Sequence, residues 1–315
     1  MSELVRIKRW KSILRNMKES STLKEETIKK EMELSKTDPE IKDMLEALYL
    51  DEDRESSFQR FCASKEFKIL FNEITRHVGY NWNAKICEIG AGPGFLAVAL
   101  AKSGFKNVSI LEPNNEWITG TGFISNSAHK YGVHVWNALD DWYESDELYD
   151  LIITKACVHH FENISKVAAE IRCKMCGNGK WLMFDEFFAN SAEEFYSALL
   201  DHAHVIRYGQ YEWPYSASLY VELMQLVGYK LIEVLPNGYE NNYLTRNIST
   251  KIKLTKIITA VVKILIKFKM TVIAFKIEHY FCTFFRLSKG FRIFRAPQLL
   301  VFTLNRIVLP SVKQD

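Results

Sequence analysis

The sequence predicts an α/β fold, a doubly wound and mostly parallel seven-stranded sheet, and three observations carry that prediction. Short apolar runs alternate with amphipathic stretches from Lys85 to Leu235, a spacing typical of strands joined by helices. A glycine-rich turn, Gly90–Gly94, directly follows the first apolar run. The 315 residues are 48% hydrophobic and 25% charged, which suits a sizeable core and excludes a disordered chain.

Residues 1–80 are predicted to form a helical amino-terminal cap. Apolar side chains recur at spacings of three and four within residues 4–17, which gives one apolar helix face and one basic face. A polar, charge-rich stretch then runs to Pro39. Two further helical patterns span Ile41–Leu50 and Phe58–Val78.

Residues 81–235 are predicted to form the core of the fold. The expected strands are Ile86–Ile89, Val108–Leu111, Val133–Trp136, Leu151–Thr154, Trp181–Phe184 and Tyr229–Leu235. A helix at Ala217–Val227, ended by Gly228, precedes the last of them. A seventh strand, Gln298–Leu304, belongs to residues 297–315, and residues 236–296 form a helical insertion before it that is unusually long for a connection.

The formal net charge of +3 conceals two basic segments. Residues 1–18 hold six basic side chains against Glu3, and residues 246–295 hold twelve against Glu278. The remaining residues hold 23 basic and 36 acidic side chains, so the body of the protein is acidic. Charge of one sign concentrated in this way points to partners rather than to fold.

The distribution of cysteines and of apolar residues predicts a cytoplasmic protein. Six cysteines are scattered along the chain, and the first eighteen residues carry charges with no apolar export segment. No run of eighteen uncharged apolar residues occurs, so a membrane-spanning helix is not expected.

The glycine loop carries the most chemistry. Glycines after a strand let a ligand approach the backbone amides at the carboxyl end of that strand. Phe95 stands where a dinucleotide fingerprint needs a small residue, Pro93 removes a donor, and Glu88 favours a cationic group, so pyrophosphate is disfavoured. Glu112 ends the next strand, twenty residues after Gly92, where a carboxylate accepts hydrogen bonds from ribose hydroxyls. The predicted ligand is a nucleoside with a positive appendage.

These motifs resemble those of the class I S-adenosylmethionine-dependent methyltransferases between Lys85 and Leu235. Glu88–Gly94 looks like the family's first motif, 110–113 like its second, Asp150–Phe161 like its fourth-strand motif and Cys176–Gly179 like the turn before the fifth strand. The resemblance implies S-adenosylmethionine as cofactor. It implies a binding site formed by Glu88, Gly90, Ala91, Gly92, Gly94, Phe95, Glu112, Pro113, Asn137, Ala138 and Lys155. The family often has Asp where this chain has Asn137, which leaves Asp140 and Asp141 as alternatives beside the adenine.

The acceptor is expected above the ends of the fourth and fifth strands. Thr154–Cys157 replaces the Asn/Asp-Pro-Pro-aromatic tetrapeptide with which the family grips amides and exocyclic amines. His159 and His160 are candidate general bases for a hydroxyl acceptor, and Glu186 is a third catalytic candidate. The alternative interpretations are a histidine ring that only packs near the cofactor and an acidic residue that only begins a helix.

The stretch after the fifth strand supplies candidate substrate contacts, which are His202, His204 and Tyr211. Cys173 and Cys176 have the spacing of half a zinc site, but two more ligands at suitable spacing are missing. We therefore interpret these cysteines as incidental thiols and expect no metal.

The basic insertion admits three interpretations. Lys256, Lys263 and Lys267 share one helical face while Lys269 and Lys276 lie on another, which predicts a break near Phe268. Lysines this frequent exclude a membrane-spanning helix. The first interpretation is that the insertion lies on an anionic membrane surface, at its cytoplasmic face. The second interpretation, which the sequence favours equally, is that the apolar faces pack on the domain or on another subunit. Nucleic acid is third, because Phe281, Phe284, Phe285, Phe291 and Phe294 are able to stack but no recognition motif accompanies them.

The sequence therefore predicts a methyltransferase that acts on a hydroxyl, and less readily on an amine, of a small or amphipathic acceptor. A sugar, a lipid-linked glycan or a secondary metabolite fits that description. The alternative is a nucleic-acid methyltransferase or binding protein that uses the basic residues 246–295.

Overall fold

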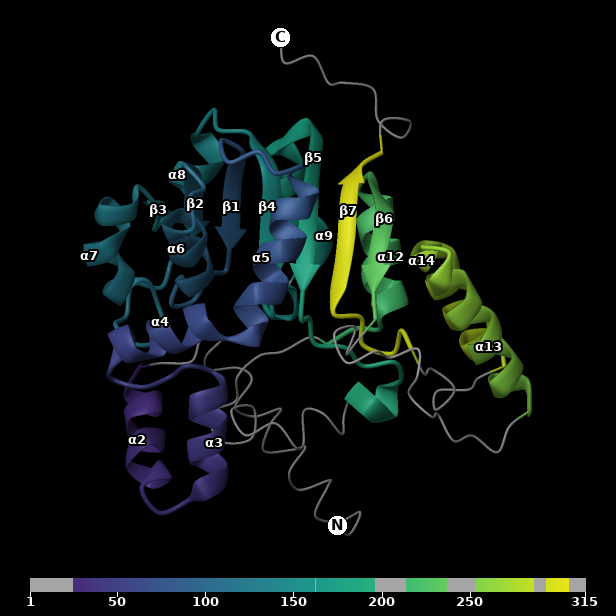
Figure 1. The fold of residues 1–315 in the computed structure, drawn as a ribbon, viewed down its shortest axis with the longest axis horizontal. Helices are drawn as coiled ribbons and strands as arrows, with labels where there is room; N and C mark the ends of the chain where they lie inside the picture. The colour runs from purple at the N-terminus through teal and green to yellow at the C-terminus, as the bar shows by residue number, and fades with distance from the viewer. Residues whose placement is uncertain (1–24, 162, 196–213, 237–252, 286–292, 306–315) are drawn as a thin grey trace.

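The computed structural model describes residues 25–161, 163–195, 214–236, 253–285 and 293–305 (Figure 1). The helices of these residues are α2 Glu25–Ser35, α3 Pro39–Ala47, α4 Arg54–Ala63, α5 Lys65–His77, α6 Phe95–Lys102, α7 Gly122–Tyr131, α8 Leu139–Glu144, the 3-10 turn η1 Val158–His160, α9 Ile164–Cys173, α12 Ala217–Leu226, α13 Lys253–Lys267 and α14 Thr271–Phe284. The strands are β1 Lys85–Ile89, β2 Asn107–Leu111, β3 His134–Trp136, β4 Tyr149–Lys155, β5 Met175–Phe184, β6 Tyr229–Leu235 and β7 Leu299–Leu304.

These strands form one seven-stranded sheet in the order β3-β2-β1-β4-β5-β7-β6. All neighbouring pairs are parallel except those of β7, which runs antiparallel to both β5 and β6. The predicted α/β fold with a mostly parallel seven-stranded sheet is therefore confirmed. The strand order reverses between β1 and β4, and in open α/β sheets ligands bind outside the carboxyl ends of the strands at such a point.

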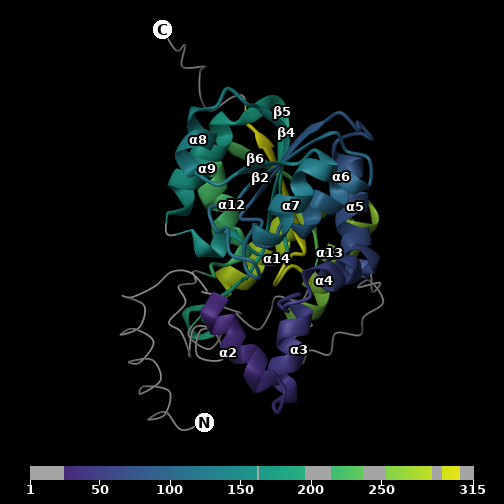
Figure 2. The ribbon, with the colours of Figure 1, turned by 90° about the vertical axis from the view of Figure 1, so that its left-hand side faces the viewer.

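Helices cover both faces of the sheet. Seen edge-on, α8, α9 and α12 lie on one face, and α5, α6 and α7 lie on the other (Figure 2). Trp181, Tyr229 and Phe302 are buried together in the core of the first face, and Leu100 and Ile110 in the core of the second. The helices α2, α3 and α4 lie beyond the carboxyl ends of β1 and β4 (Figure 1).

Three local features differ from the sequence prediction. The helical pattern predicted as Phe58–Val78 is two helices, because Ser64 adopts an extended conformation and its side chain accepts the N–H of Phe67 to begin α5. The polar stretch before Pro39 contains the helix α2. Cys176 lies within β5, not in a turn before it, because β5 begins at Met175 and its pairing register with β4 shifts after that residue.

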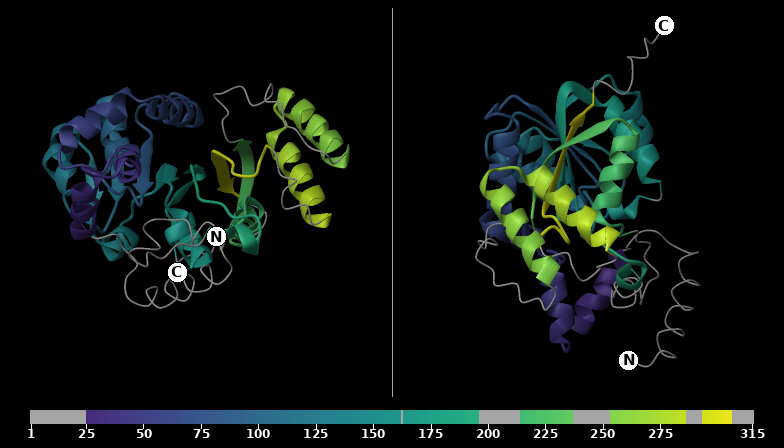
Figure 3. Two further views of the ribbon diagram at one scale, coloured as in Figure 1. Left: turned by 90° about the horizontal axis from the view of Figure 1, so that it is seen from below. Right: turned by 90° about the vertical axis from the view of Figure 1, so that its right-hand side faces the viewer.

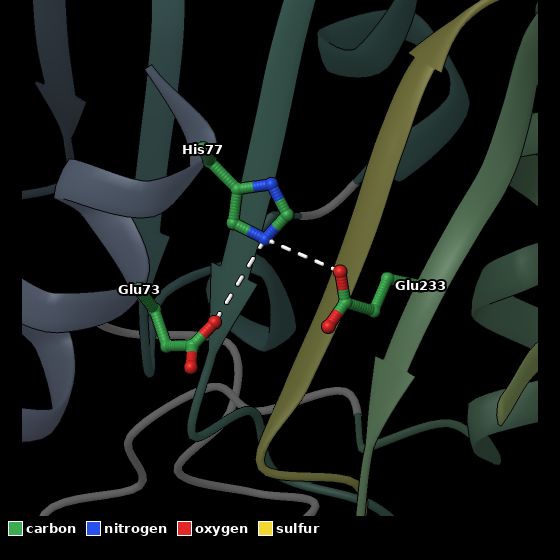
Figure 4. A group of neighbouring side chains, drawn as sticks. All are labelled: Glu73, His77 and Glu233. Atoms are coloured by element: carbon green, nitrogen blue, oxygen red, sulfur yellow. Dashed lines mark ion pairs between the residues drawn. The ribbon is translucent and has the colours of Figure 1, made fainter. Parts of the chain in front are cut away.

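An ion-pair cluster joins α5 to β6, as Figure 4 shows for Glu73, His77 and Glu233. These three residues have the ligand types of a metal site, but Arg76 supplies the cation. Its guanidinium donates to both carboxylates, with 2.8 Å and 3.1 Å to Glu233, and to Nε2 of His77 at 3.0 Å. Burial, together with the charges of Arg76 and Lys180, lowers the pKa of His77 to about 3, so the ring is neutral.

Replacing Arg76 with Ala should lower the free energy of unfolding by about 1–2 kcal/mol, because the two carboxylates then face each other without their cation. Urea denaturation measures this difference. Neither EDTA nor added zinc should change the melting temperature of the unaltered protein. A chelator-dependent drop would contradict the assignment of Arg76 as the cation of this cluster.

The insertion forms a helical hairpin, α13 and α14, at the β6 edge of the sheet (Figure 3). The predicted break is confirmed: residues 268–270 separate the helices, and Lys269 has a positive φ of 58°. Ile258 and Val262 are buried in the main core, so this face packs on the domain. Phe294, one of the proposed stacking residues, is fully buried and therefore not accessible to a base. None of the helices in the described ranges has the length and apolar character needed to cross a bilayer.

Candidate functional site

A cavity of about 470 Å³ opens where the sheet order reverses, at the carboxyl ends of β1, β2 and β4. Most of the predicted cofactor residues line it, namely Glu88, Gly90, Ala91, Gly92, Phe95, Glu112, Pro113 and Lys155. A volume of this size is typical of small-molecule sites. Motifs separated by up to 67 positions in the sequence thus meet in one cavity, as parallel strands require.

The glycine loop adopts left-handed backbone angles at Gly90, Gly92 and Gly94, with φ of 64°, 51° and 69°. A Cβ at Gly90 would lie 2.0 Å from Sγ of Cys157, and one at Gly94 would lie 2.3 Å from Ile124. These two glycines are therefore required by the packing of the chain itself, in addition to any ligand. At Gly92 the nearest atom would be 3.6 Å away, so only there does space remain beside the backbone.

Glu112 ties the glycine loop to the end of β2. Its Oε2 accepts the N–H of Gly92 at 2.8 Å, and its Oε1 accepts the N–H of Asn114 at 2.9 Å. Burial raises the pKa of the carboxyl, against the lowering effect of these two donors. Each carboxylate oxygen retains a second lone pair, and the side chain lines the cavity, so the carboxylate has acceptor capacity left for a ligand.

Glu88 is buried at the bottom of the cavity, and its Oε2 accepts the N–H of Ala97 in the first turn of α6 at 2.9 Å. Burial raises the pKa of its carboxyl to about 8, although the Ala97 hydrogen bond and the charge of Lys155 act in the opposite direction. The carboxyl is therefore mostly protonated at neutral pH. A cationic group placed in the cavity would favour the ionised form.

The helical cap supplies the wall of the cavity that faces the strand ends, and none of its residues was predicted to belong to the site. Leu48, Tyr49 and Leu50, between α3 and α4, line the cavity together with Phe61 of α4. Tyr49 has a positive φ of 55°, and its ring packs edge-on against Phe61 and Phe95. The segment has no motif, and only the placement of the cap over the strand ends reveals it.

Lys155 connects the sheet to this wall. Its Nζ lies 2.7 Å from Glu66 of α5, and Glu66 also accepts the hydroxyl of Tyr49 at 3.2 Å. The residues that follow β4 and β5, Ala156 and Asp185, have positive φ of 46° and 47°. Non-glycine residues in this region store conformational strain, which concentrates at functional sites.

The three catalytic candidates form a connected series. Glu186 is buried, and its carboxylate accepts the N–H of Val158 at 2.8 Å and contacts Nδ1 of His159. Burial alone would raise the pKa of Glu186, but His159 and the neighbouring N–H groups lower it overall. The ring of His159 is buried and lies 4.1 Å from the ring of His160, measured between centroids. Among the three, only the exposed His160 lines the cavity.

The remaining predicted residues lie elsewhere. Gly94 is not among the residues that line the cavity, and Asn137 and Ala138 are exposed beyond β3. His202, His204 and Tyr211 lie outside the described residues. Cys173 ends α9 and is exposed, while Cys176 lies in β5, and neither belongs to a group of metal-ligand type within the described ranges.

Comparison with known proteins gives a match to a family. A family model described as a methyltransferase domain matches residues 47–234, more than half of the chain. No curated protein matches the chain.

Several solved structures are similar at low identity. The StiE O-MT segment is 12% identical, with 83% of this chain and 81% of that chain covered and a TM-score of 0.45. The mitomycin 7-O-methyltransferase is 15% identical, with a TM-score of 0.42. The match covers 73% of this chain and 64% of that chain, which is less than two thirds of its length. The magnesium protoporphyrin IX methyltransferase from Synechocystis PCC 6803, solved with bound SAH, is 11% identical, with 56% and 77% covered and a TM-score of 0.38.

Proposed function

The chain belongs to the methyltransferase domain family, as a class I S-adenosylmethionine-dependent methyltransferase, and on that premise we propose that it methylates a hydroxyl group in the cavity beside His160. The supporting observation is the meeting of Glu112, the glycine loop and His160 in one cavity at the strand ends.

The residues present fit S-adenosylmethionine. Glu112 offers two acceptor positions to the ribose diol, and the open side of Gly92 lets the ligand approach the backbone. The buried carboxyl of Glu88 compensates positive charge on the methionine part. When bound, the sulfonium supplies a methyl group with a good leaving thioether, so the protein has mainly to orient the acceptor and accept its proton.

His160 is the residue that supports a hydroxyl acceptor. Histidine exchanges protons near neutral pH, and this ring lines the cavity. Glu186 has a lowered pKa and holds His159, which packs against His160, so we assign Glu186 and His159 a positioning role. The end of β4 lacks the tetrapeptide that grips amides, which disfavours an amide acceptor.

The cavity wall favours an acceptor with an apolar body. Leu48, Leu50, Phe61 and Phe161 are among the residues that line the cavity. A hydroxylated secondary metabolite or the lipid-proximal end of a lipid-linked glycan presents both an apolar surface and a hydroxyl. A fully polar sugar would leave these side chains in contact with hydroxyls they cannot pair.

Replacing His160 with Gln should lower kcat by about 10²-fold, the typical contribution of a general base, while cofactor binding changes little. The experiment measures release of the demethylated cofactor with phenols and alcohols and with their amino counterparts. The acid limb of the pH–rate profile should be lost in the variant. The control is His134→Gln, at an exposed site on β3 that does not line the cavity.

Two results would contradict this proposal. Transfer to the amines with none to the matched hydroxyls would refute the acceptor class. Unchanged kcat and an unchanged pH profile in the His160 variant would remove that residue from the chemistry while leaving the cofactor site standing.

A further inference from the structure

The α13–α14 hairpin is apolar on two faces, and the fold uses only one of them. The inner face packs on the main core through Ile258, Val262 and Ile266 of α13 and through Ala274 and Phe275 of α14. Both helices thus turn their buried sides toward the same core. The hairpin forms the outermost layer at the β6 edge of the sheet (Figures 1 and 3).

The outer face carries a second apolar stripe. On α13 and the turn after it, Ile257, Val261, Ile264 and Phe268 recur at spacings of four, three and four, with exposed fractions from 41% to 73%. On α14, Ile273, Tyr280 and Phe284 continue the pattern and are exposed by 45% to 67%. At 100° per residue, each stripe lies roughly opposite the buried face of its own helix. We call these seven residues the outer stripe.

Lysines border the outer stripe. Lys256, Lys263 and Lys267 directly precede Ile257, Ile264 and Phe268, and Lys269 and Lys276 add two more positive charges. The only acidic residue among residues 253–285 is Glu278, which is buried and accepts the N–H groups of Ile293 and Phe294. Glu222 of α12 and Lys276 both line a groove between α12 and α14. The outer surface of the hairpin therefore combines apolar side chains with net positive charge.

We propose that the outer stripe docks on an anionic phospholipid surface, with the hairpin lying in the plane of the membrane interface. Aliphatic and aromatic side chains enter the boundary between headgroups and acyl chains, while lysines stay level with the phosphates. This arrangement removes exposed apolar surface from water and neutralises the lysines at the same time. It requires no spanning helix.

The same features argue against two other occupants. A second copy would bring the lysines of one hairpin against those of the other, because no exposed acid on residues 253–285 complements them. A nucleic acid would satisfy the charge and would find rings at Phe268, Tyr280 and Phe284, but the four aliphatic members of the stripe, Ile257, Val261, Ile264 and Ile273, offer no ring on which bases stack. Acyl chains accept aliphatic and aromatic side chains alike.

The test is co-sedimentation of the full chain with vesicles of phosphatidylcholine alone and of phosphatidylcholine mixed with phosphatidylglycerol. Binding should require the anionic lipid and weaken as salt is raised. Replacing Lys267, Lys269 and Lys276 with Gln should lower the partition coefficient about five-fold for each lysine. The pair Ile264→Ser and Phe268→Ser should lower it at least ten-fold.

The matched controls are Leu139→Ser on α8 and Lys68→Gln on α5, both exposed and outside the hairpin. Neither should change vesicle binding, and far-UV circular dichroism and melting temperature establish that every variant is folded. The proposal is overturned if the protein does not bind anionic vesicles, or if the stripe variants bind as the unaltered protein does. It is also overturned if the stripe variants abolish a dimer in sedimentation analysis without changing vesicle binding.

Discussion

Replacing Glu112 with Ala should weaken binding of S-adenosylmethionine by about 10²- to 10³-fold. The substitution removes both acceptors for the ribose diol, and a hydrogen bond to a charged group contributes about 1.5–3 kcal/mol. It also releases the N–H groups of Gly92 and Asn114, which the carboxylate accepts at 2.8 Å and 2.9 Å. The glycine loop therefore loses the contact that fixes it against β2, and the ligand must order it on binding.

Isothermal titration calorimetry with the cofactor and with its demethylated product measures this loss. Glu112→Gln serves as an intermediate variant, because it retains one acceptor oxygen but presents an amide donor to the other partner. The control is Glu144→Ala on α8, an exposed acidic residue that does not line the cavity. If Glu112→Ala binds the cofactor within two-fold of the unaltered protein, the cofactor lies elsewhere. A two-fold change corresponds to a difference in binding free energy of about 0.4 kcal/mol.

The sheet follows from local pattern, and this explains why its prediction succeeded. Apolar runs of four to seven residues between glycine or polar turns define parallel strands, because strands buried on both faces are apolar throughout. The predicted strand Tyr229–Leu235 coincides with β6, and Leu299–Leu304 differs from its prediction by one residue. The break at Ser64 was missed because the apolar spacing continues across it, and only the local backbone conformation ends one helix there.

The cavity was predictable where motifs mark it and not where they are absent. Glu88 and Glu112 stand at strand ends, and parallel topology brings them together. Tyr49 and Glu66 come from the cap, whose position over the strand ends depends on packing between distant segments. The requirement for glycine at position 90 was assigned to the ligand alone, but the approach of Cys157 was invisible without the structure.

The same limit applies to the hairpin. The sequence shows apolar residues at positions 257, 258, 261, 262 and 264, and its periodicity alone does not identify which side faces the core. Ile258 and Val262 are buried while Ile257 and Ile264 are exposed. The distinction depends on the contact of the hairpin with the rest of the core, which is tertiary information.

Replacing Glu88 with Gln should stabilise the protein at alkaline pH and weaken cofactor binding. Burial raises the pKa of Glu88 from 4.5 to about 8, so between these values the folded state holds a proton that the unfolded state has released. Stability contributed by this proton is fully present below pH 4.5 and is lost as the pH rises through 8. Above that pH the buried carboxylate destabilises the fold, on the order of a few kcal/mol.

Gln keeps an oxygen that accepts the N–H of Ala97 and carries no charge. The Glu88→Gln variant is therefore not destabilised by a buried carboxylate at alkaline pH. Urea denaturation should give equal stability for both proteins near pH 4.5 and a more stable variant at pH 9, where the ionisation of all other groups is common to both.

In the unaltered protein, the positive charge of S-adenosylmethionine should lower the pKa of Glu88 and release up to one proton on binding at pH 7. Calorimetry in two buffers of different ionisation enthalpy measures that proton, and its absence from the Glu88→Gln titration assigns it. Equal stability at pH 9 would show that this carboxyl is already ionised before the cofactor binds, and proton release that persists in the variant would assign the proton to another group.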